Sequence, residues 1–359
     1  MQFGVQFFPD VKPEEKSARD YFRDSLDIAE AADGLGYSHV RIVEHYFHYY
    51  GGYSPNPIVF LAAAAQRTKK ARLITGALLP IFNNPMKLAG EIGMLDAISD
   101  GRLDVGFARA FLPHEFRRFG RSPDESFARF REGVEQIDLM LTQENVTHAG
   151  KFHDIKDVTS LPRPTQLPRP KFYVAATGNA DSFEYAGTNG YSIMAIPLAG
   201  PKMRETLQIY RDAWRAAGHP GNGEVMLAFQ MFADHDSERA RRIAKPKMEA
   251  YLHSLVEAAS DWAEGTSSKD YPGYDKMVEK LRLETMESQI ASGAAWVGTP
   301  DEIGASIARV QEEFGGFEHA SMQINFNTMP QDEAMRSLKL FGTEVIPRFD
   351  PAVAAGSAR

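Results

Sequence analysis

Residues 73–109 of this 359-residue chain, LITGALLPIFNNPMKLAGEIGMLDAISDGRLDVGFAR, contain one complete strand–helix–strand unit. The apolar run Leu73–Leu79 predicts a buried strand, and a helix is expected over Pro85–Ser99, where Asp100-Gly101 ends it. A second apolar run, Leu103–Arg109, predicts the next strand. Two strands joined by a helix in this way form the repeating unit of parallel α/β folds.

The same alternation extends over the rest of the chain, where short apolar runs are separated by longer segments of helical period. Further strands are expected at residues 3–8, 39–44, 172–176, 191–196, 225–232 and 320–326. Together with the first unit they indicate an eight-stranded (β/α)8 TIM barrel. Such barrels often exceed about 250 residues as one domain, so we expect residues 1–359 to form a single α/β domain.

One segment does not follow this repeat. Residues 261–299, an insertion before the eighth strand, include GTSSKD at 265–270 and YPG at 271–273. Long unstructured inserts in compact domains are usually lids or disordered segments. We therefore expect a mobile lid at the mouth of the barrel, and a surface excursion without a role is the alternative.

The composition argues against several classes of function. The formal net charge is -8, and no long basic run is present to neutralise the phosphates of a nucleic acid. The absence of cysteine excludes disulfides, thiolate metal sites and a cysteine nucleophile. No window approaches the roughly 18 apolar residues of a membrane span, and the N-terminus has no signal-peptide pattern. We expect a cytoplasmic protein with no membrane or nucleic-acid partner.

In a TIM barrel the reactive groups lie at the carboxyl ends of the strands. The second predicted strand ends in Glu44–Tyr50, a run dense in aromatic and imidazole side chains. The fourth ends in Ala108 and Arg109, and the fifth continues through Ala176 into residues that directly precede a helix. These strand ends are the candidate functional segments, and the aromatic run suits a wall for a flat ring or a subunit interface.

The start of the helix after the fifth strand is a candidate anion site. Thr177, Gly178 and Ser182 lie where backbone N–H groups are unpaired and the helix dipole favours negative charge. Arg109 would add a bidentate positive charge suited to a phosphate. Thr177 or Asn179 would equally serve as an ordinary helix cap, so the residues alone leave both interpretations open.

A metal site is the competing interpretation of the second strand end. His45 and His48 are three residues apart, but metal-dependent hydrolase barrels take several His and Asp ligands from different strands. The strand ends at Ala176, Ile196 and Phe232 offer none. A metal-dependent TIM-barrel hydrolase therefore remains only an alternative, and no residue is assigned as a metal ligand.

Several motifs, in order along nearly the whole chain, resemble the bacterial luciferase-like family of flavin-dependent monooxygenases. Glu-His-Tyr-Phe at 44–47 is similar to the Glu-His-His-Phe signature of that family. The other motifs are Asn84–Ala89, Asp96–Arg102, Gly106–Arg109, Glu115–Gly120, Val297–Ile303 and Phe341–Pro347. The resemblance implies a luciferase-like barrel that binds FMN as FMNH2.

Carried over residue by residue, the resemblance implies roles at the strand ends. His45 would be the catalytic histidine near the reactive carbon of the flavin, and Glu44 would support the site below the ring. Gly76 and Ala77 would back the ring, at a position where the family often has a non-prolyl cis peptide. The FMN phosphate would be bound by Arg109, Thr177, Gly178 and Ser182, with Ala108 beside the cofactor.

The implied reaction is that of a two-component monooxygenase. A separate flavin reductase supplies FMNH2, O2 forms a C4a-peroxide on the flavin, and one oxygen enters a small hydrophobic or aromatic substrate. No Gly-x-Gly-x-x-Gly follows a strand, so the chain shows no NAD(P)H domain of its own. An F420-dependent oxidoreductase of the same barrel family is the alternative.

The chain also departs from the family pattern. Tyr46 replaces a second histidine and Ala108 replaces a reactive cysteine of some luciferases, so light emission is not implied. The family analogy further implies a homodimer, or a heterodimer with a paralogue. Its interface would use the helices after the second and third strands, where Ala62–Ala65 permits close packing.

Overall fold

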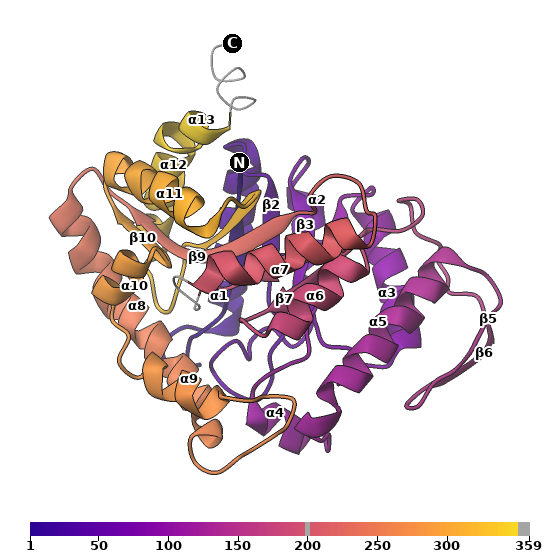
Figure 1. Ribbon diagram of the computed structural model, residues 1–359. Coiled ribbons are helices and arrows are strands. Elements are labelled where there is room, and N and C mark those ends of the chain that lie inside the picture. The colour runs from indigo at the N-terminus through magenta and orange to yellow at the C-terminus, as the bar shows by residue number, and fades with distance from the viewer. Residues whose placement is uncertain (198–201, 351–359) are drawn as a thin grey trace.

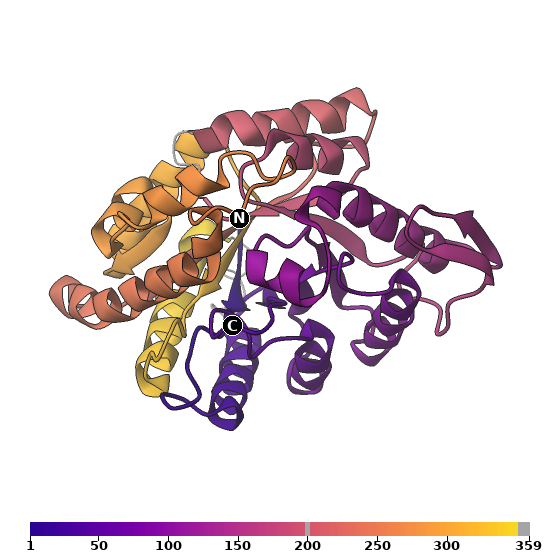
Figure 2. The same cartoon turned by 90° about the horizontal axis from the view of Figure 1, so that it is seen from below.

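The computed structural model describes residues 1–197 and 202–350; residues 198–201 and 351–359 of the predicted single domain lie outside this part. Eight parallel strands of the described chain form a barrel surrounded by helices (Figures 1 and 2). The strands are β1 (Gln2–Phe7), β2 (His39–Ile42), β3 (Arg72–Leu78), β4 (Leu103–Phe107), β7 (Lys171–Ala176), β8 (Ser192–Ala195), β9 (Val225–Ala233) and β11 (His319–Gln323).

Strand pairing closes the barrel. Neighbouring strands follow the order β11-β1-β2-β3-β4-β7-β8, and β9 pairs in parallel with both β8 and β11. The registers include Gln2 opposite His319 and Ile193 opposite Val225. The α/β class and the (β/α)8 TIM barrel predicted from the sequence are thereby confirmed.

The main core lies between the strands and the surrounding helices. Phe3, Val5 and Phe7 of β1 and Val40 and Ile42 of β2 belong to it, because alternate strand residues point outward. The helices are α1 (Ala18–Gly34), α2 (Pro57–Arg67), α3 (Pro85–Ile98), α4 (Pro113–Arg118), α5 (Ser126–Thr142), α6 (Ala180–Thr188), α7 (Met203–Ala216), α8 (Ser237–Ala259), α9 (Tyr274–Leu281), α10 (Met286–Ser292), α11 (Pro300–Phe314), α12 (Gln331–Glu344) and α13 (Ile346–Phe349).

Local chemistry explains where these helices begin. The Asn84 side chain accepts a hydrogen bond from Met86 N at 2.9 Å, and Pro85 occupies the first turn of α3, where its missing N–H costs nothing. None of the helices in the described residues combines the length and apolar character that crossing a bilayer requires.

The segment 261–299 is not the unstructured insertion that the sequence suggested. It contains α9, α10 and a strand, β10 (Ala295–Gly298), which pairs in parallel with the second half of β9. Trp296 of β10 stacks on Phe229 of β9 with ring centroids 4.0 Å apart, and both rings are buried. An extra strand followed by helix α11 therefore precedes β11, and packing of apolar side chains stabilises it.

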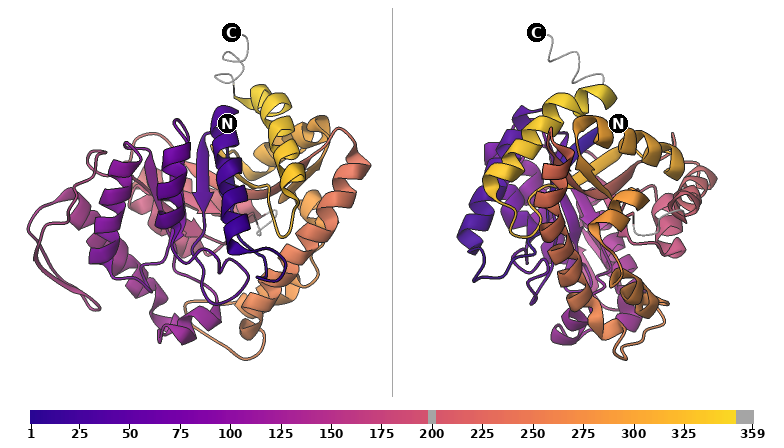
Figure 3. Two further views of the ribbon diagram at one scale, coloured as in Figure 1. Left: turned by 180° about the vertical axis from the view of Figure 1, so that it is seen from behind. Right: turned by 90° about the vertical axis from the view of Figure 1, so that its left-hand side faces the viewer.

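A second difference is an antiparallel hairpin of β5 (Val146–Ala149) and β6 (Asp154–Val158), which lies between α5 and β7 where no strand was expected. It projects from the side of the barrel (Figures 1 and 3). Val146 and Ile155 bury their side chains in the core cluster and so anchor it. The hairpin has little apolar alternation, and its strands were therefore not predicted.

Helices α6 and α7 pack closely at Gly187. A Cβ at this position would lie 2.5 Å from Tyr210 O and 2.8 Å from Ala213 Cβ. Replacing Gly187 with Ala should therefore lower the free energy of unfolding by about 1–3 kcal/mol, the usual cost of overpacking. Chemical denaturation measures this value. The control is Gly34→Ala at the end of α1, where nothing lies within 4 Å of a Cβ; an equal loss in both variants would contradict the packing argument.

Candidate active site

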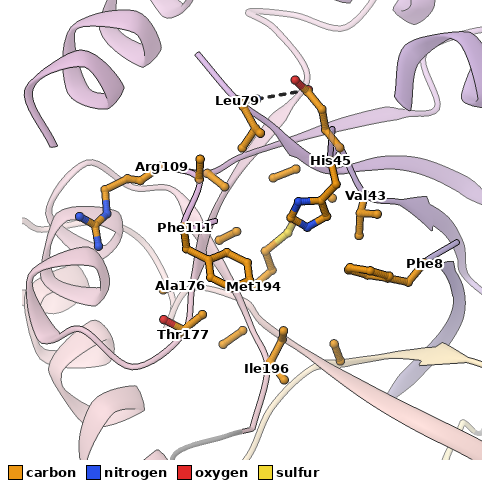
Figure 4. A pocket seen from close by; sticks show the side chains of 18 of the residues that line it. Phe8, Val43, His45, Leu79, Arg109, Phe111, Ala176, Thr177, Met194 and Ile196 are labelled. Atoms are coloured by element: carbon orange, nitrogen blue, oxygen red, sulfur yellow. Dashed lines mark hydrogen bonds between the residues drawn. The ribbon is translucent and has the colours of Figure 1, made fainter. Parts of the chain in front are cut away.

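The carboxyl ends of the strands surround a cavity that opens to solvent. Its volume, including the open mouth, is about 930 Å³. In Figure 4 the His45 ring points into it between Phe8 and Phe111. Bulky residues normally fill a barrel interior, whereas small ones leave this space open. The small lining residues are Gly76, Ala77, Ala108, Ala110, Ala175, Ala176, Ala195 and Ala228.

The structure brings almost all predicted site residues to this one cavity. Gly178 is the exception, since it is not part of the lining. The predicted residues that line the cavity are Glu44, His45, Gly76, Ala77, Ala108, Arg109, Thr177 and Ser182. His45 and Thr177, which follow β2 and β7, lie on different sides of the same space (Figure 4).

A buried carboxylate fixes the orientation of His45. Its Nδ1 lies 3.1 Å from Oε1 of Glu115 on α4, and the same oxygen accepts a hydrogen bond from Tyr46 N at 2.9 Å. Glu115 has no exposed surface. His45 Nε2 makes no hydrogen bond to any residue in the described chain, and the ring lines the cavity. An imidazole held in this way can take up or release a proton at its free nitrogen.

Glu44 is a second buried carboxylate beside the first. Its Oε1 accepts hydrogen bonds from Tyr46 Oη at 2.5 Å and Asn83 Nδ2 at 2.8 Å, and Oε2 accepts one from Leu79 N at 3.3 Å. Burial raises the pKa of Glu44 from 4.5 to about 7, with a smaller contribution from Glu115, although the three hydrogen bonds act in the opposite direction. Glu44 can therefore exchange a proton near neutral pH.

The raised pKa of Glu44 predicts a pH-dependent stability. The folded protein holds this proton more tightly than the unfolded chain, so the free energy of unfolding should fall as pH rises from about 4.5 to 7. Relative to Glu44→Gln, the wild type should lose up to about 3 kcal/mol over this window. Urea denaturation at several pH values measures the difference. An exposed control, Glu205→Gln, should leave it unchanged; parallel curves for wild type and Glu44→Gln would refute the assignment.

The wall formed by Gly76 and Ala77 has the feature that the family resemblance implied, because the peptide bond between them is cis. Arg41 of β2 lies directly against Gly76. A Cβ on Gly76 would be 2.0 Å from Arg41 Nε, so only glycine fits beside this side chain. The lining thus combines a flat backbone surface with a buried guanidinium.

Arg109, the predicted phosphate ligand, is buried and already has partners. Its Nη1 donates hydrogen bonds to Ser126 Oγ at 3.3 Å and to Asp270 O at 3.2 Å. Its guanidinium lies 3.7 Å from the ring centroid of Phe127 and 4.9 Å from that of Tyr271. Arg109 therefore connects the cavity to α5 and to segment 261–299, and a phosphate bound there would exchange with some of these contacts.

At the start of α6 the helix cap and the candidate anion site use different residues. Asn179 is the cap, since its side chain accepts a hydrogen bond from Asp181 N at 2.9 Å. Thr177 Oγ1 lies 3.0 Å from Tyr274 Oη on α9, and Ser182 lines the cavity from the first turn. The two interpretations left open by the sequence are thus compatible, with Thr177 and Ser182 free of the capping role.

Sequence reasoning missed several residues of the site. Glu115 lies within a recognised motif, but nothing marked it as the partner of His45. Tyr251 of α8 and Tyr274 of α9 reach the cavity from distant segments, and Gln6 and Arg41 enter it from inside the barrel. The alternation of β1 and β2 was the available signal for these last two, because it turns every second residue, including Gln6 and Arg41, toward the barrel interior.

The histidines do not form the metal site considered as an alternative. His48 Nδ1 accepts a hydrogen bond from Tyr50 N at 3.1 Å, whereas His45 pairs with Glu115. Within residues 1–197 and 202–350, no three or more His, Cys, Asp or Glu side chains are grouped so that they could hold a metal ion.

Comparison with known proteins finds relatives over nearly the whole chain. The family model described as luciferase-like monooxygenase matches residues 1–316. The crystal structure of a monooxygenase from Streptomyces bottropensis is 42% identical, has a TM-score of 0.86, and the match covers 97% of this chain and 100% of that one. The oxygenase component of a flavin-dependent trigonelline monooxygenase from Acinetobacter baylyi is 29% identical, over 97% of this chain and 96% of the relative. An F420-dependent glucose-6-phosphate dehydrogenase from Kineococcus radiotolerans is 27% identical, over 90% and 92%.

Proposed function

Because the chain belongs to the luciferase-like monooxygenase family, we propose that it is the oxygenase component of a two-component flavin monooxygenase. It would bind FMNH2 and transfer one oxygen atom of O2 to a small hydrophobic or aromatic organic substrate. The observation that carries this proposal is one cavity that holds both His45, oriented by Glu115, and the candidate phosphate ligands Arg109, Thr177 and Ser182.

The residues of the cavity fit FMN. Its small lining residues leave room for a flat ring system against Gly76 and Ala77, and hydroxyl and guanidinium groups suited to a phosphate lie at one side. We propose that Arg109, Thr177 and Ser182 bind the phosphate, with Gly178 contributing backbone at the start of α6. Bound reduced flavin would supply the activation of O2, and the protein would position it.

His45 would hold or move a proton at Nε2 next to the reacting atoms. Glu115 keeps the ring in one orientation and favours a proton on Nδ1, which leaves Nε2 facing the cavity. Phe8, Tyr50 and Phe111 surround the imidazole with ring centroids 5.3–6.0 Å away and limit the access of water. Glu44 would support the site through its contacts with Tyr46 and Leu79.

A flavin reductase is the proposed transient partner. The Acinetobacter baylyi relative is named as the oxygenase component of its enzyme, which supports a separate protein as the source of reduced flavin. F420 is the competing cofactor, since the Kineococcus radiotolerans relative is named for it. Anaerobic titration with reduced FMN and reduced F420, followed by mixing with O2, distinguishes the two: tight binding of F420 alone would overturn the proposal.

Two substitutions should separate cofactor binding from chemistry. His45→Ala should leave the affinity for FMNH2 largely unchanged and slow oxygen transfer by about 10²–10⁴-fold, the usual contribution of a positioned acid–base group. Arg109→Ala should weaken FMNH2 binding by about tenfold or more, because a charge-assisted contact is lost. Anaerobic titration and single-turnover kinetics measure these effects, with Arg336→Ala on α12 as an exposed control. Undiminished turnover in the first variant, or wild-type affinity in the second, would remove the assigned role.

We also propose that segment 261–299 acts as a lid. Its contacts with the cavity rim are the hydrogen bonds from Arg109 to Asp270 O and between Thr177 and Tyr274, together with Trp262 Nε1 donating to Phe111 O at 2.7 Å. The segment therefore touches the residues proposed to bind phosphate. Its movement would couple entry of the cofactor to closure of the cavity.

A dimer through α2 and α3 completes the proposal. These helices lie side by side and expose large apolar side chains, with 67% of Val59, 56% of Met94 and 38% of Ile98 accessible. The small residues Ala62 and Ala63 of α2 would allow a second copy or a paralogue to approach closely. Burial of this surface would be the driving force of association.

Adding charge to this surface should prevent association. Met94→Glu and Val59→Glu should each shift the protein to a monomer, because a carboxylate would be buried without a partner. Sedimentation velocity measures the mass. Leu283→Glu, at a position with 80% exposure after α9, is the control and should leave the mass unchanged. A monomeric wild type, or dimers in all three variants, would rule this interface out.

A further inference from the structure

Arg41 is a buried cation at the inner end of the cavity, and no carboxylate of residues 1–197 and 202–350 pairs with it. It is 7% exposed. Its Nη1 donates to Gln6 Oε1 at 2.7 Å and its Nη2 to Gly76 O at 3.1 Å. Its Nε has no hydrogen-bond partner among the described residues, and both Arg41 and Gln6 line the cavity. All its contacts in this part of the chain are therefore to neutral oxygens.

The other ionisable groups of the cavity do not supply the missing negative charge. Those that line it are Glu44, His45, Tyr50, Arg109, Tyr251 and Tyr274. Glu44, the one carboxylic acid, uses its oxygens for Tyr46, Asn83 and Leu79. Burial lowers the pKa of Arg41 to about 10, which still leaves the guanidinium protonated at neutral pH.

A charge buried without a counter-ion is costly, and a fold retains one mainly where a ligand completes it. The cavity provides the access. Gly76 lies against the Arg41 side chain, and the small side chains of Ala108, Ala175 and Ala228 line the same cavity. A flat ring that enters between these residues would reach the guanidinium edge-on, where a planar fork of donors suits a delocalised anion.

From this geometry we infer that Arg41 and Gln6 form a recognition site for a delocalised negative charge on the edge of a planar ring. Two carriers share this chemistry: an aromatic carboxylate or phenolate substrate, and the anionic pyrimidine edge of reduced flavin. If the substrate bears this negative charge, the inference depends on the proposed function only in assuming that the substrate is an organic molecule. Gln6 would hold the guanidinium in place through Oε1, so Arg41 is the binding group and Gln6 a positioning residue.

The first experiment uses benzoate and the flavin-free protein. Isothermal titration should show that Arg41→Met weakens benzoate binding tenfold or more, the usual size of a lost charge-assisted hydrogen bond, while Arg41→Lys retains part of it. Arg215→Met, the same change on the outer helix α7, is the matched control and should bind as the wild type does. Circular dichroism and thermal unfolding confirm that each variant is folded.

The second experiment follows the ionisation of protein-bound reduced FMN by absorbance under anaerobic conditions. If the flavin is the carrier, Arg41→Met should raise the ionisation midpoint by about one pH unit or more. If the substrate is the carrier, benzoate binding is lost and the midpoint stays unchanged. Equal benzoate binding and equal midpoints in wild type and Arg41→Met would overturn the inference. Failure of reduced FMN to bind would instead overturn the proposed function, and the benzoate titration would still test the anion site.

Discussion

The pairing of β9 with both β8 and β11 is the constraint on which the site depends, because it closes the sheet. In an open sheet the ends of β2 and β7 would lie about 14 Å apart along one edge, three strand spacings from each other. Closure turns these ends toward a common space, so His45 and Thr177 line one cavity. Small residues inside the barrel then decide that the space stays open rather than being filled by the core.

The polar centre of the site consists of two buried acidic side chains, Glu44 and Glu115, and Tyr46 connects them. Its hydroxyl donates to Glu44 and its backbone N–H donates to Glu115, which also pairs with His45. Tyr46 stands at the position of the second histidine in the Glu-His-His-Phe signature that this segment resembles. Its phenol stabilises Glu44 without adding another group that titrates near neutral pH. The departure from the family pattern therefore has a structural role in this chain.

The sequence predicted the parts of the structure that depend on local pattern. Apolar runs and helical periodicity located the barrel strands, and the strand ends directed attention to Glu44, His45 and Arg109. Contacts between distant segments had no such signal: β10 is held by Trp296 stacking on Phe229, and Glu115 reaches His45 from helix α4. Arg41 was visible only as one of several polar residues in a short strand. That no described residue supplies its counter-ion appears only once the barrel surrounds it.

Two hydrogen bonds of segment 261–299 occupy side chains that we propose to bind phosphate: Arg109 pairs with Asp270 O, and Thr177 pairs with Tyr274. These internal contacts would compete with the ligand. A phosphate bound at the proposed site would displace contacts that these side chains already make, so part of its intrinsic binding free energy would be used for the exchange. The apparent affinity for a phosphorylated cofactor would then understate the strength of the pocket. A flavin lacking the phosphate would leave those contacts intact. The phosphate of the cofactor, and not its ring, would therefore be the group that alters the contacts of α9 when the cofactor binds.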